Sequence, residues 1–177
     1  MKIDFSEPES SILRISKNLH QSKTISSSSE NKELRNLICK LCKLFYQKGW
    51  ASGTGGGISI REGNKIFMAP SSVQKERIQP EEIFILDMDG NILQKPNNGL
   101  KVSECKPLFM HAYQLRNAGA VLHSHSIHAM LVTWLYDTHF RITNLEMQKG
   151  ISGFGAFDVL EVPIISNTAR NISFQIL

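Results

Sequence analysis

A run of glycines between a predicted helix and a predicted hairpin is the feature that most limits what this chain can fold into. Four of the five residues from Gly53 to Gly57 are glycine. A P-loop or a Rossmann fingerprint needs the order strand, loop, helix, and the run lacks a Gly-Lys-Ser/Thr sequence. The order therefore argues against a nucleotide site. Two interpretations stay open: the glycines turn several backbone N–H groups toward one anion, or they form a tight connector where backbones pass closely.

Periodicity predicts the elements on both sides of this run. Apolar residues in steps of three and four from Leu34 to Phe45 predict an amphipathic helix that ends near Gly49. Turns at Gly63-Asn64 and Asp89-Gly90 predict two β-hairpins. Further along the chain, the sequence predicts a helix from Pro107 to Asn117, a short buried strand from Ala120 to His125, a helix from about Ser126 to Tyr136 and a strand from Val159 to Ile165.

Alternating helices and strands predict an α/β layered domain over residues 31–168, with no internal repeat. Residues 1–30 contain nine serines and a single aromatic residue, a composition that predicts a disordered arm. With 177 residues and 41% hydrophobic content, the chain can bury one core of ordinary size.

Charge and cysteine usage exclude several classes of function. The net charge is +4, and basic residues alternate with acidic ones, as in Lys75-Glu76-Arg77, so no basic stripe for nucleic acid is expected. The most apolar stretch, Ala129 to Leu135, is too short to cross a bilayer. Three unevenly spaced cysteines point to a reducing compartment, and we expect a cytoplasmic protein. For Cys39 and Cys42 we favour core packing over a redox or metal pair.

The sequence His123-Ser-His125 is the strongest candidate for chemistry. Side chains alternate along a strand, so both imidazoles point to one face, about 6.5–7 Å apart. We favour a metal site over two polar residues at a strand end, although a catalytic zinc takes three protein ligands and the third is not evident. His128 is interpreted as a surface residue. Glu104 and Glu146 are candidates for moving a proton beside the metal, and periodicity does not choose between them.

Seven motifs between Leu34 and Thr168 occur together in a recognisable order. They are Gly49-Trp-Ala-Ser-Gly-Thr-Gly-Gly-Gly-Ile-Ser59, Ala69-Pro-Ser71, Val73-Gln-Lys-Glu-Arg-Ile-Gln-Pro-Glu81, Cys105-Lys-Pro-Leu-Phe-Met110, Gly119-Ala-Val-Leu-His-Ser-His125, Glu146-Met-Gln-Lys-Gly150 and Val162-Pro-Ile-Ile165. This succession resembles the eukaryotic methylthioribulose-1-phosphate dehydratases of the class II aldolase and adducin superfamily.

The resemblance implies a class II aldolase-like α/β/α domain with a mixed, largely antiparallel central sheet that is incomplete at the C-terminus. It implies one Zn²⁺ per subunit and the dehydration of 5-methylthioribulose 1-phosphate to 5-methylthio-2,3-dioxopentyl phosphate in methionine salvage. By motif, the implied roles are zinc ligand for His123 and His125, acid/base for Glu146, second catalytic candidate for Glu104, and substrate binding for Cys105, Gly55, Gly56 and Ser71.

The chain departs from the family's pattern in three places. Ser72 replaces the glycine of a Pro-Ser-Gly motif, where a residue with positive φ or a close phosphate contact is expected. Glu104 stands where the animal enzymes tend to have Gln, whereas the aldolases and the bacterial dehydratases have a Glu that can act as a base or contact the metal. After Thr168 the His-Gly motif that supplies the family's third zinc ligand is absent, and residues 169–177 form a divergent tail instead, so we expect this chain alone to bind zinc poorly.

The resemblance also bears on partners. It implies a sugar phosphate substrate, a homo-oligomer such as a tetramer and an apoptosis-machinery partner. The charge pattern and the short apolar runs predict neither nucleic acid nor a membrane as a partner. Two alternatives stay open: an inactive truncated form that acts as a binding or regulatory protein, and a zinc aldolase for another sugar phosphate.

Overall fold

The computed structural model describes residues 27–166, with side chains described from residue 31 onward. Contacts divide the chain into a unit of Met1–Glu33 and a unit of Leu34–Leu177, and the description below concerns the second. Helix α2 spans Ser27–Gln47, so the helix begins before the expected boundary at residue 30. The rest of the expected arm and the 169–177 tail lie outside the described residues.

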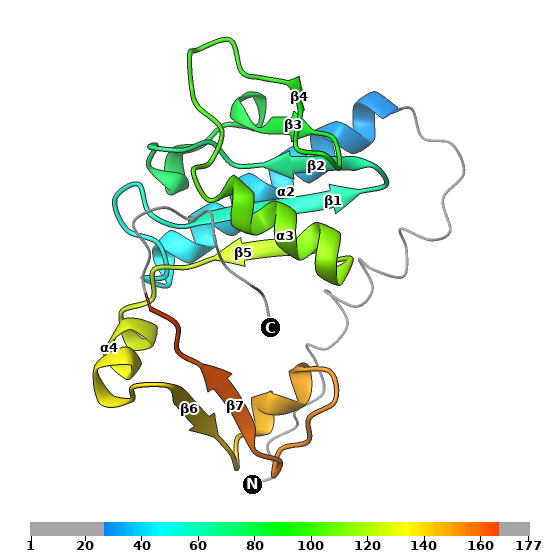
Figure 1. Cartoon of the computed structure of the whole chain (residues 1–177). Coiled ribbons are helices and arrows are strands. Elements are labelled where there is room, and N and C mark those ends of the chain that lie inside the picture. Colours follow the sequence, from blue (N-terminus) through cyan, green and yellow to red (C-terminus); the bar gives the residue numbers. More distant parts are fainter. Residues whose placement is uncertain (1–26, 167–177) are drawn as a thin grey trace, which may run out of the picture. The chain divides into compact units, whose positions relative to one another are not determined.

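A five-stranded sheet forms the centre of the second unit (Figure 1). Its strands are β1 (Gly57–Glu62), β2 (Lys65–Met68), β3 (Phe84–Leu86), β4 (Ile92–Gln94) and β5 (Ala120–His123), in the spatial order β4-β3-β2-β1-β5. All four pairings in this sheet are antiparallel. Both predicted hairpins are confirmed, and the turn residues Gly63 and Gly90 have φ values of 55° and 84°, which glycine adopts without strain.

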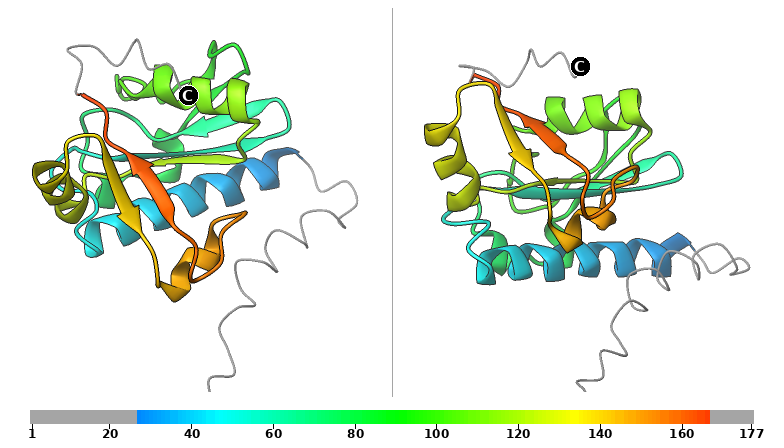
Figure 2. Two further views of the ribbon diagram at one scale, coloured as in Figure 1. Left: turned by 60° about the horizontal axis from the view of Figure 1, so that its bottom comes forward. Right: turned by 90° about the horizontal axis from the view of Figure 1, so that it is seen from below.

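One helix covers each face of the sheet, as seen edge-on in the right-hand view of Figure 2. Adjacent residues of β2 point to opposite faces: Phe67 packs with Ile38 and Cys42 of α2, whereas Ile66 packs in the cluster of α3 (Lys106–Arg116). These two apolar layers confirm the predicted α/β/α arrangement. Cys42 is buried, in agreement with the core-packing interpretation.

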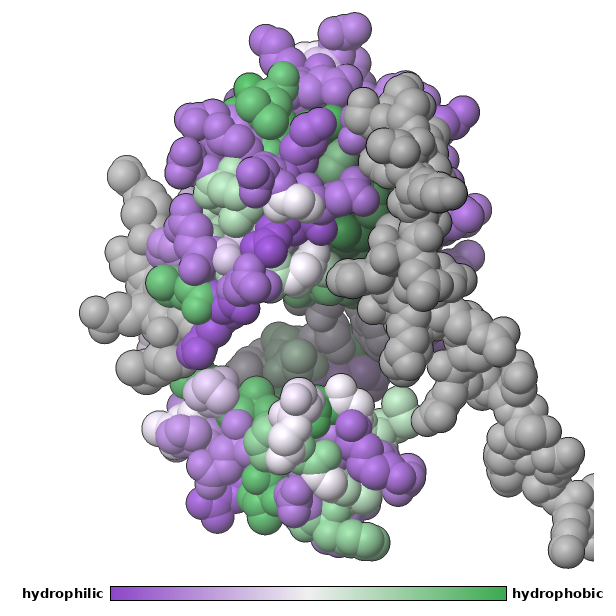
Figure 3. Space-filling model, turned by 90° about the vertical axis from the view of Figure 1, so that its right-hand side faces the viewer, coloured by the Kyte–Doolittle hydropathy of each residue, from purple (hydrophilic) through white to green (hydrophobic). Residues whose placement is uncertain are grey.

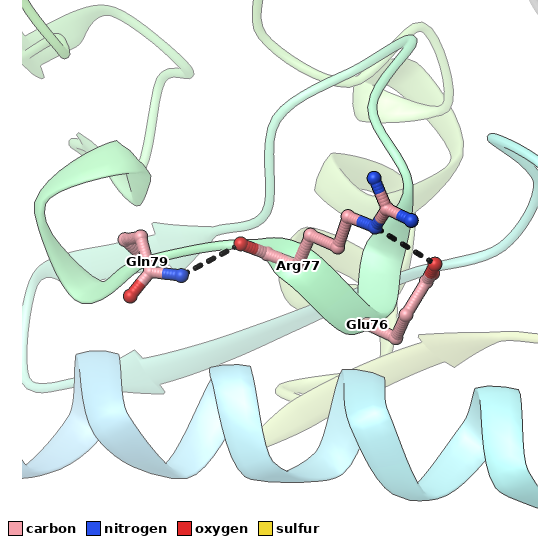
Figure 4. A network of polar contacts seen from close by, with 3 residues as sticks. All are labelled: Glu76, Arg77 and Gln79. Carbon is pink, nitrogen blue, oxygen red and sulfur yellow. Dashed lines mark hydrogen bonds and ion pairs between the residues drawn. The ribbon is translucent and has the colours of Figure 1, made fainter.

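Two short 3₁₀ helices, η1 (Lys75–Arg77) and η2 (Pro80–Glu82), connect β2 to β3. The Gln79 side chain donates a hydrogen bond to the carbonyl of Arg77 at 2.8 Å, and Arg77 Nε lies 3.7 Å from Glu76 Oε1 (Figure 4). Arg35 of α2 donates to the backbone carbonyls of Pro80 and Ile83 at 3.0 and 2.9 Å. These bonds fix the connection against the helix.

Residues 126–166, called here the C-terminal region, contain α4 (Ile127–Leu135), β6 (His139–Ile142), η3 (Glu146–Gly150) and β7 (Leu160–Pro163). Strands β6 and β7 form an antiparallel pair in a separate two-stranded sheet. The sequence predicted α4 and β7 but not β6, which carries two charged or polar residues in four. Within the described part of the chain, no helix has the length and apolar character needed to span a membrane.

The prediction of a buried strand from Ala120 to His125 was wrong in two respects. Strand β5 ends at His123, two residues early, and it is not buried: Leu122 is 50% exposed. β5 is the last strand in the order of the sheet, and its burial pattern alternates between exposed and intermediate. An apolar run therefore indicated a strand here but did not establish what covers it.

Candidate active site

A pocket of about 230 Å³ lies at one end of the central sheet. β1 is antiparallel to both β2 and β5, so the start of β1 lies at the same end as the ends of β2 and β5. Three features therefore meet there. They are the glycine loop, residues 53–57, at the start of β1; the serine loop, Ser71 and Ser72, after β2; and the His pair, with His123 at the end of β5 and His125 just beyond it. The pocket is lined by Thr54, Gly55, Gly56, Ser71, Ser72, Lys75, Ser103, Glu104, Cys105, His123 and His125.

The two histidines lie closer together than their sequence spacing predicted. Their ring centroids are 4.7 Å apart, with the rings tilted by 48°. His123 is held by the pairing of β5 with β1, opposite Gly57, and the backbone N–H of His125 donates to the carbonyl of Trp50 at 2.7 Å. Since His125 lies beyond the strand, the backbone can turn and bring the imidazoles together.

The environment of His123 favours its neutral form. Burial lowers the pKa of His123 below its usual value, and the nearby His125 and Lys75 lower it further. A neutral imidazole is the form that binds a metal ion. At neutral pH His123 is therefore in the form that a metal ion could bind.

Cys105 lies directly before α3 and contacts the His pair. Its Sγ is 3.2 Å from His123 Nδ1, and its backbone N–H donates to Ser103 Oγ at 3.2 Å. Burial raises the pKa of the Cys105 thiol above its ordinary value, so the protonated thiol is the form present at neutral pH. The thiol can donate a hydrogen bond to His123 or accept one from it, depending on which ring nitrogen of His123 carries the proton.

The glycine loop is shaped by the close approach of the histidines. A Cβ atom added at Gly55 would lie 2.6 Å from His125 Nδ1, and one added at Gly56 would lie 3.0 Å from the carbonyl oxygen of His123. Gly56 also has a φ of +75°. The interpretation of the run as a connector where backbones pass closely is therefore confirmed, and the same loop lines the pocket.

The serine loop carries a non-glycine residue in a left-handed conformation. Ser72, which stands where the family was expected to have glycine, has a φ of 56°. Its Oγ lies 3.3 Å from Ser71 Oγ, and the Ser71 backbone N–H donates to the Lys101 carbonyl at 2.8 Å. The expectation of positive φ at this position is confirmed, and both hydroxyl-bearing residues line the pocket.

Lys75 is a pocket residue that the sequence reasoning missed. The sequence reasoning noted it only as a basic residue next to an acidic one, yet it is 3% exposed. Its Nζ donates to the carbonyls of Thr54 at 2.9 Å and Val73 at 3.1 Å. The sequence does not indicate that Lys75 is buried, because the charged residues Glu76 and Arg77 follow it and such a run is usually exposed to solvent. Two signals were available: Lys75 stands four residues after Ser71, and it lies inside the motif from Val73 to Glu81 that carries the resemblance.

The two candidate carboxylates have different positions. Glu104 lines the pocket, with an exposed side chain. Glu146 starts η3, is exposed, forms an ion pair with Lys149 and does not line the pocket. The structure thus brings seven of the eight predicted site residues together, and Glu146 is the exception.

The donor set fits part of a zinc site. His123 and His125 present two imidazoles at one edge of the pocket. Among residues 27–166, no group of three His, Cys, Asp or Glu side chains is arranged to hold a metal ion. A catalytic zinc uses three protein ligands. The described residues could therefore supply two of the three.

Comparisons with known proteins agree with this fold. The sequence profile of the Class II Aldolase and Adducin N-terminal domain matches residues 36–173. The L-fuculose-1-phosphate aldolase from Thermus thermophilus is structurally similar, with a TM-score of 0.61 and 22% sequence identity, over 78% of this chain and 64% of that one. Another L-fuculose 1-phosphate aldolase has a TM-score of 0.54 and 22% identity, over 63% of this chain and 50% of that one.

Relatives found by sequence share a higher fraction of identical residues with this chain than these solved structures do. A probable methylthioribulose-1-phosphate dehydratase from Leishmania braziliensis is 53% identical over 75% of this chain and 63% of its own length. The methylthioribulose-1-phosphate dehydratase from Gallus gallus is 53% identical over 76% of this chain and 62% of its own length. The chain therefore spans about three fifths of the length of these curated relatives. With the profile covering most of its residues and the same fold in solved relatives, the chain belongs to the class II aldolase and adducin N-terminal domain family.

Proposed function

We propose that this chain carries the substrate pocket of a hydro-lyase that converts 5-methylthioribulose 1-phosphate into 5-methylthio-2,3-dioxopentyl phosphate. The observation that carries the proposal is the pocket itself, where the His pair, a thiol, a carboxylate, the glycine loop and a serine loop meet. Relatives with 53% identity are named as dehydratases of methylthioribulose 1-phosphate, which supports this substrate. The reaction belongs to methionine salvage, and we place it in the cytoplasm.

In this proposal, His123 and His125 are two ligands of a zinc ion. When bound, zinc supplies Lewis-acid polarisation of the substrate's oxygens. The neutral form of His123, favoured by its burial, is ready to serve as a ligand. The contact with Cys105 at 3.2 Å orients the His123 ring.

The overall reaction removes one water from the substrate. A base takes the proton at C3, next to the C2 carbonyl, and hydroxide leaves from C4 with a proton from an acid. The resulting enol becomes the 2,3-diketone. The enzyme thus needs a carboxylate that moves protons near C3 and C4, while other groups hold the two ends of the substrate.

Two carboxylates are candidates for these proton transfers. The resemblance implies Glu146 as the acid/base, but Glu146 acts only if η3 reaches a pocket, either in the same chain or in another copy. Glu104 already lines the pocket. Replacing each by glutamine decides between them: the true acid/base variant should lose activity by about 10²–10⁴-fold.

The proposal is tested by incubating the purified chain with zinc and 5-methylthioribulose 1-phosphate, and by following the loss of one water with mass spectrometry. An active full-length relative assayed in parallel is the control. If the zinc-loaded chain gives no product while the control does, this chain is not a dehydratase by itself.

An aldolase acting on another sugar phosphate is the second candidate. The position of Glu104 inside the pocket favours it, because a carboxylate beside a metal ligand pair can also serve carbon–carbon cleavage. The products distinguish the two: an aldolase splits the substrate into two carbon fragments, whereas a dehydratase keeps all its carbons in one.

We also propose a homo-oligomer, a tetramer by analogy with the family. Its support is the C-terminal region, where large apolar side chains such as Trp134 and Phe157 are exposed. Light scattering on the purified chain tests it. A monomer with no affinity for itself, for zinc or for the substrate would instead favour the alternative of a purely regulatory protein.

A further inference from the structure

The buried ammonium group of Lys75 forms no ion pair with the residues that the structure describes. The side chain is 3% exposed, and no described carboxylate lies within 4 Å of it. The carboxylate of the neighbouring Glu76 is directed at Arg77 instead, at 3.7 Å (Figure 4). A fully buried charge is ordinarily paired, because removing it from water without an opposite charge is costly.

Backbone carbonyls compensate only part of this charge. Lys75 Nζ donates two hydrogen bonds, to Thr54 O at 2.9 Å and to Val73 O at 3.1 Å. An ammonium has three N–H groups, so one donor is left for another partner. Burial lowers the pKa of Lys75, while the charges of nearby acidic groups, Glu76 among them, act in the opposite direction.

The position of Lys75 makes a bound anion the natural partner. Lys75 lines the pocket together with Ser71 and Ser72, whose hydroxyl oxygens are 3.3 Å apart. The bond to the Thr54 carbonyl links the ammonium to the glycine loop, which lines the same pocket. One cation and two neighbouring hydroxyls suit a group with several anionic oxygens, as in a phosphate monoester.

We propose that Lys75 is a specificity residue that supplies the positive charge for the phosphate group of the substrate, with Ser71 and Ser72 as hydroxyl donors. The identity of the whole substrate rests on the proposed dehydratase function, but binding of a phosphate group does not. Lys75 thus makes the pocket select phosphorylated over unphosphorylated sugars.

The test measures binding of inorganic phosphate to the full chain by isothermal titration calorimetry. Lys75→Gln removes the charge but keeps an amide donor for the loop carbonyls, whereas Lys75→Met removes both. We expect each to weaken phosphate binding by about 10- to 100-fold, as for the loss of a hydrogen bond to a charged group. Lys106→Gln is the matched control, because Lys106 also donates to a backbone carbonyl, that of Gly90, but does not line the pocket.

A purely structural role predicts another pattern. If Lys75 only ties the loop, Lys75→Gln should restore the phosphate affinity that Lys75→Met loses, and that result would overturn the proposal. Absence of phosphate binding to the unmodified chain would also overturn it. Circular dichroism checks that each variant is folded. Should both Lys75 variants unfold, Ser72→Ala, at an exposed position, decides: several-fold weaker phosphate binding supports the site, and unchanged binding contradicts it.

The dehydratase assay is read separately from the phosphate titration. Charge-dependent phosphate binding without any dehydration would uphold the role of Lys75 and reject the proposed reaction. Dehydration that is as fast in Lys75→Gln as in the unmodified chain, with an equal KM, would uphold the reaction and reject the role of Lys75.

Discussion

The burial of apolar side chains differs between two parts of the molecule, the sheet region (residues 34–125) and the C-terminal region (residues 126–166). All seventeen buried hydrophobic residues of the described chain lie between Ile38 and Tyr113. Thirteen of the twenty large hydrophobic residues that are exposed lie in the C-terminal region, and Figure 3 shows hydrophobic side chains on its surface. The most apolar stretch of the sequence, in α4, is thus among the least buried.

This contrast shows that hydrophobicity predicts burial only where a partner surface exists. In the sheet region, α2 and α3 each meet one face of a five-stranded sheet. The C-terminal region offers its apolar residues a two-stranded sheet, which is too small to bury them. The candidate active site lies wholly within the region that has its own core.

The largest effect that sharpens this contrast is expected from a matched pair of phenylalanine substitutions. Phe67 is 0% exposed and Phe157 is 82% exposed. Phe67→Ala should lower the free energy of unfolding by about 3–5 kcal/mol, because it leaves a cavity between α2 and the sheet. Phe157→Ala should change it by less than about 0.5 kcal/mol. Urea denaturation measures both, and equal losses would contradict the division into two regions.

The next largest effect is expected in amide hydrogen exchange, whose rate should differ between the sheet region and the C-terminal region. Amides in β2 and β3 lie in the middle of the sheet between two packed layers, whereas those in α4, β6 and β7 lack a buried apolar layer. We expect exchange to be at least about 100-fold faster in the C-terminal region, because it opens without disrupting the core. Similar protection across residues 34–166, measured by mass spectrometry, would show that the chain opens as one cooperative unit.

Within the sheet region, Gly55→Ala should weaken zinc binding by about 10- to 100-fold, the size usual for displaced supporting groups at metal sites. The added Cβ would lie 2.6 Å from His125 Nδ1, so the exposed ring must move while the backbone stays. Gly119→Ala is the control, because a Cβ there meets open space. A competitive zinc titration compares the variants. Unchanged affinity in Gly55→Ala would show that His125 is not a ligand.

The sequence was informative wherever local chemistry decides the structure. The Gly63-Asn64 and Asp89-Gly90 turns specify hairpins through their own backbone preferences, and Pro107 specifies the first turn of α3. Such elements need little from the rest of the chain. The spacing of His123 and His125 likewise indicated that the two rings converge.

Features that depend on distant partners could not be predicted in the same way. Lys75 is buried because the glycine loop, 21 residues earlier, supplies a carbonyl for its ammonium group. The exposure of Leu122 depends on what covers β5, and the position of Glu146 outside the pocket depends on where η3 packs. Neither follows from periodicity, which reports a pattern along one element only.

A smaller effect is expected at the left-handed residues of the two regions. Ser72→Gly should raise the free energy of unfolding by about 0.5–1 kcal/mol, because relief of the strain at φ 56° exceeds the added flexibility of the unfolded chain. Asn144→Gly, at φ 58° in the C-terminal region, should gain less, because asparagine tolerates this conformation. Thermal unfolding measures both.

Ser72→Gly should also weaken phosphate binding, because it removes a hydroxyl donor. A destabilised variant with unchanged phosphate affinity would contradict both the strain and the phosphate contact assigned to Ser72.

The smallest effect is a pH dependence that originates in the core of the sheet region. Burial raises the pKa of Tyr113 from its usual value of 10.0 to about 12, although a hydrogen bond with Ser59 at 2.6 Å acts in the opposite direction. Above pH 10 the unfolded chain therefore loses this proton before the folded chain does, and stability falls as the pH rises. From pH 8 to pH 10 the loss from this group is about 0.4 kcal/mol, and it grows toward pH 12.

Tyr113→Phe tests this dependence, but it leaves the buried Ser59 hydroxyl without its partner, which lowers stability at every pH. The informative quantity is therefore the slope of stability against pH, not its level, and the double variant Ser59→Ala with Tyr113→Phe should show the same flattened slope with a smaller loss of stability. Tyr136→Phe, at an exposed tyrosine of the C-terminal region, is the control. If the slope between pH 8 and pH 10 is the same in the unmodified chain and in both Tyr113 variants, the Tyr113 ring is not held in a closed core, and the contrast between the two regions is weaker than their burial indicates.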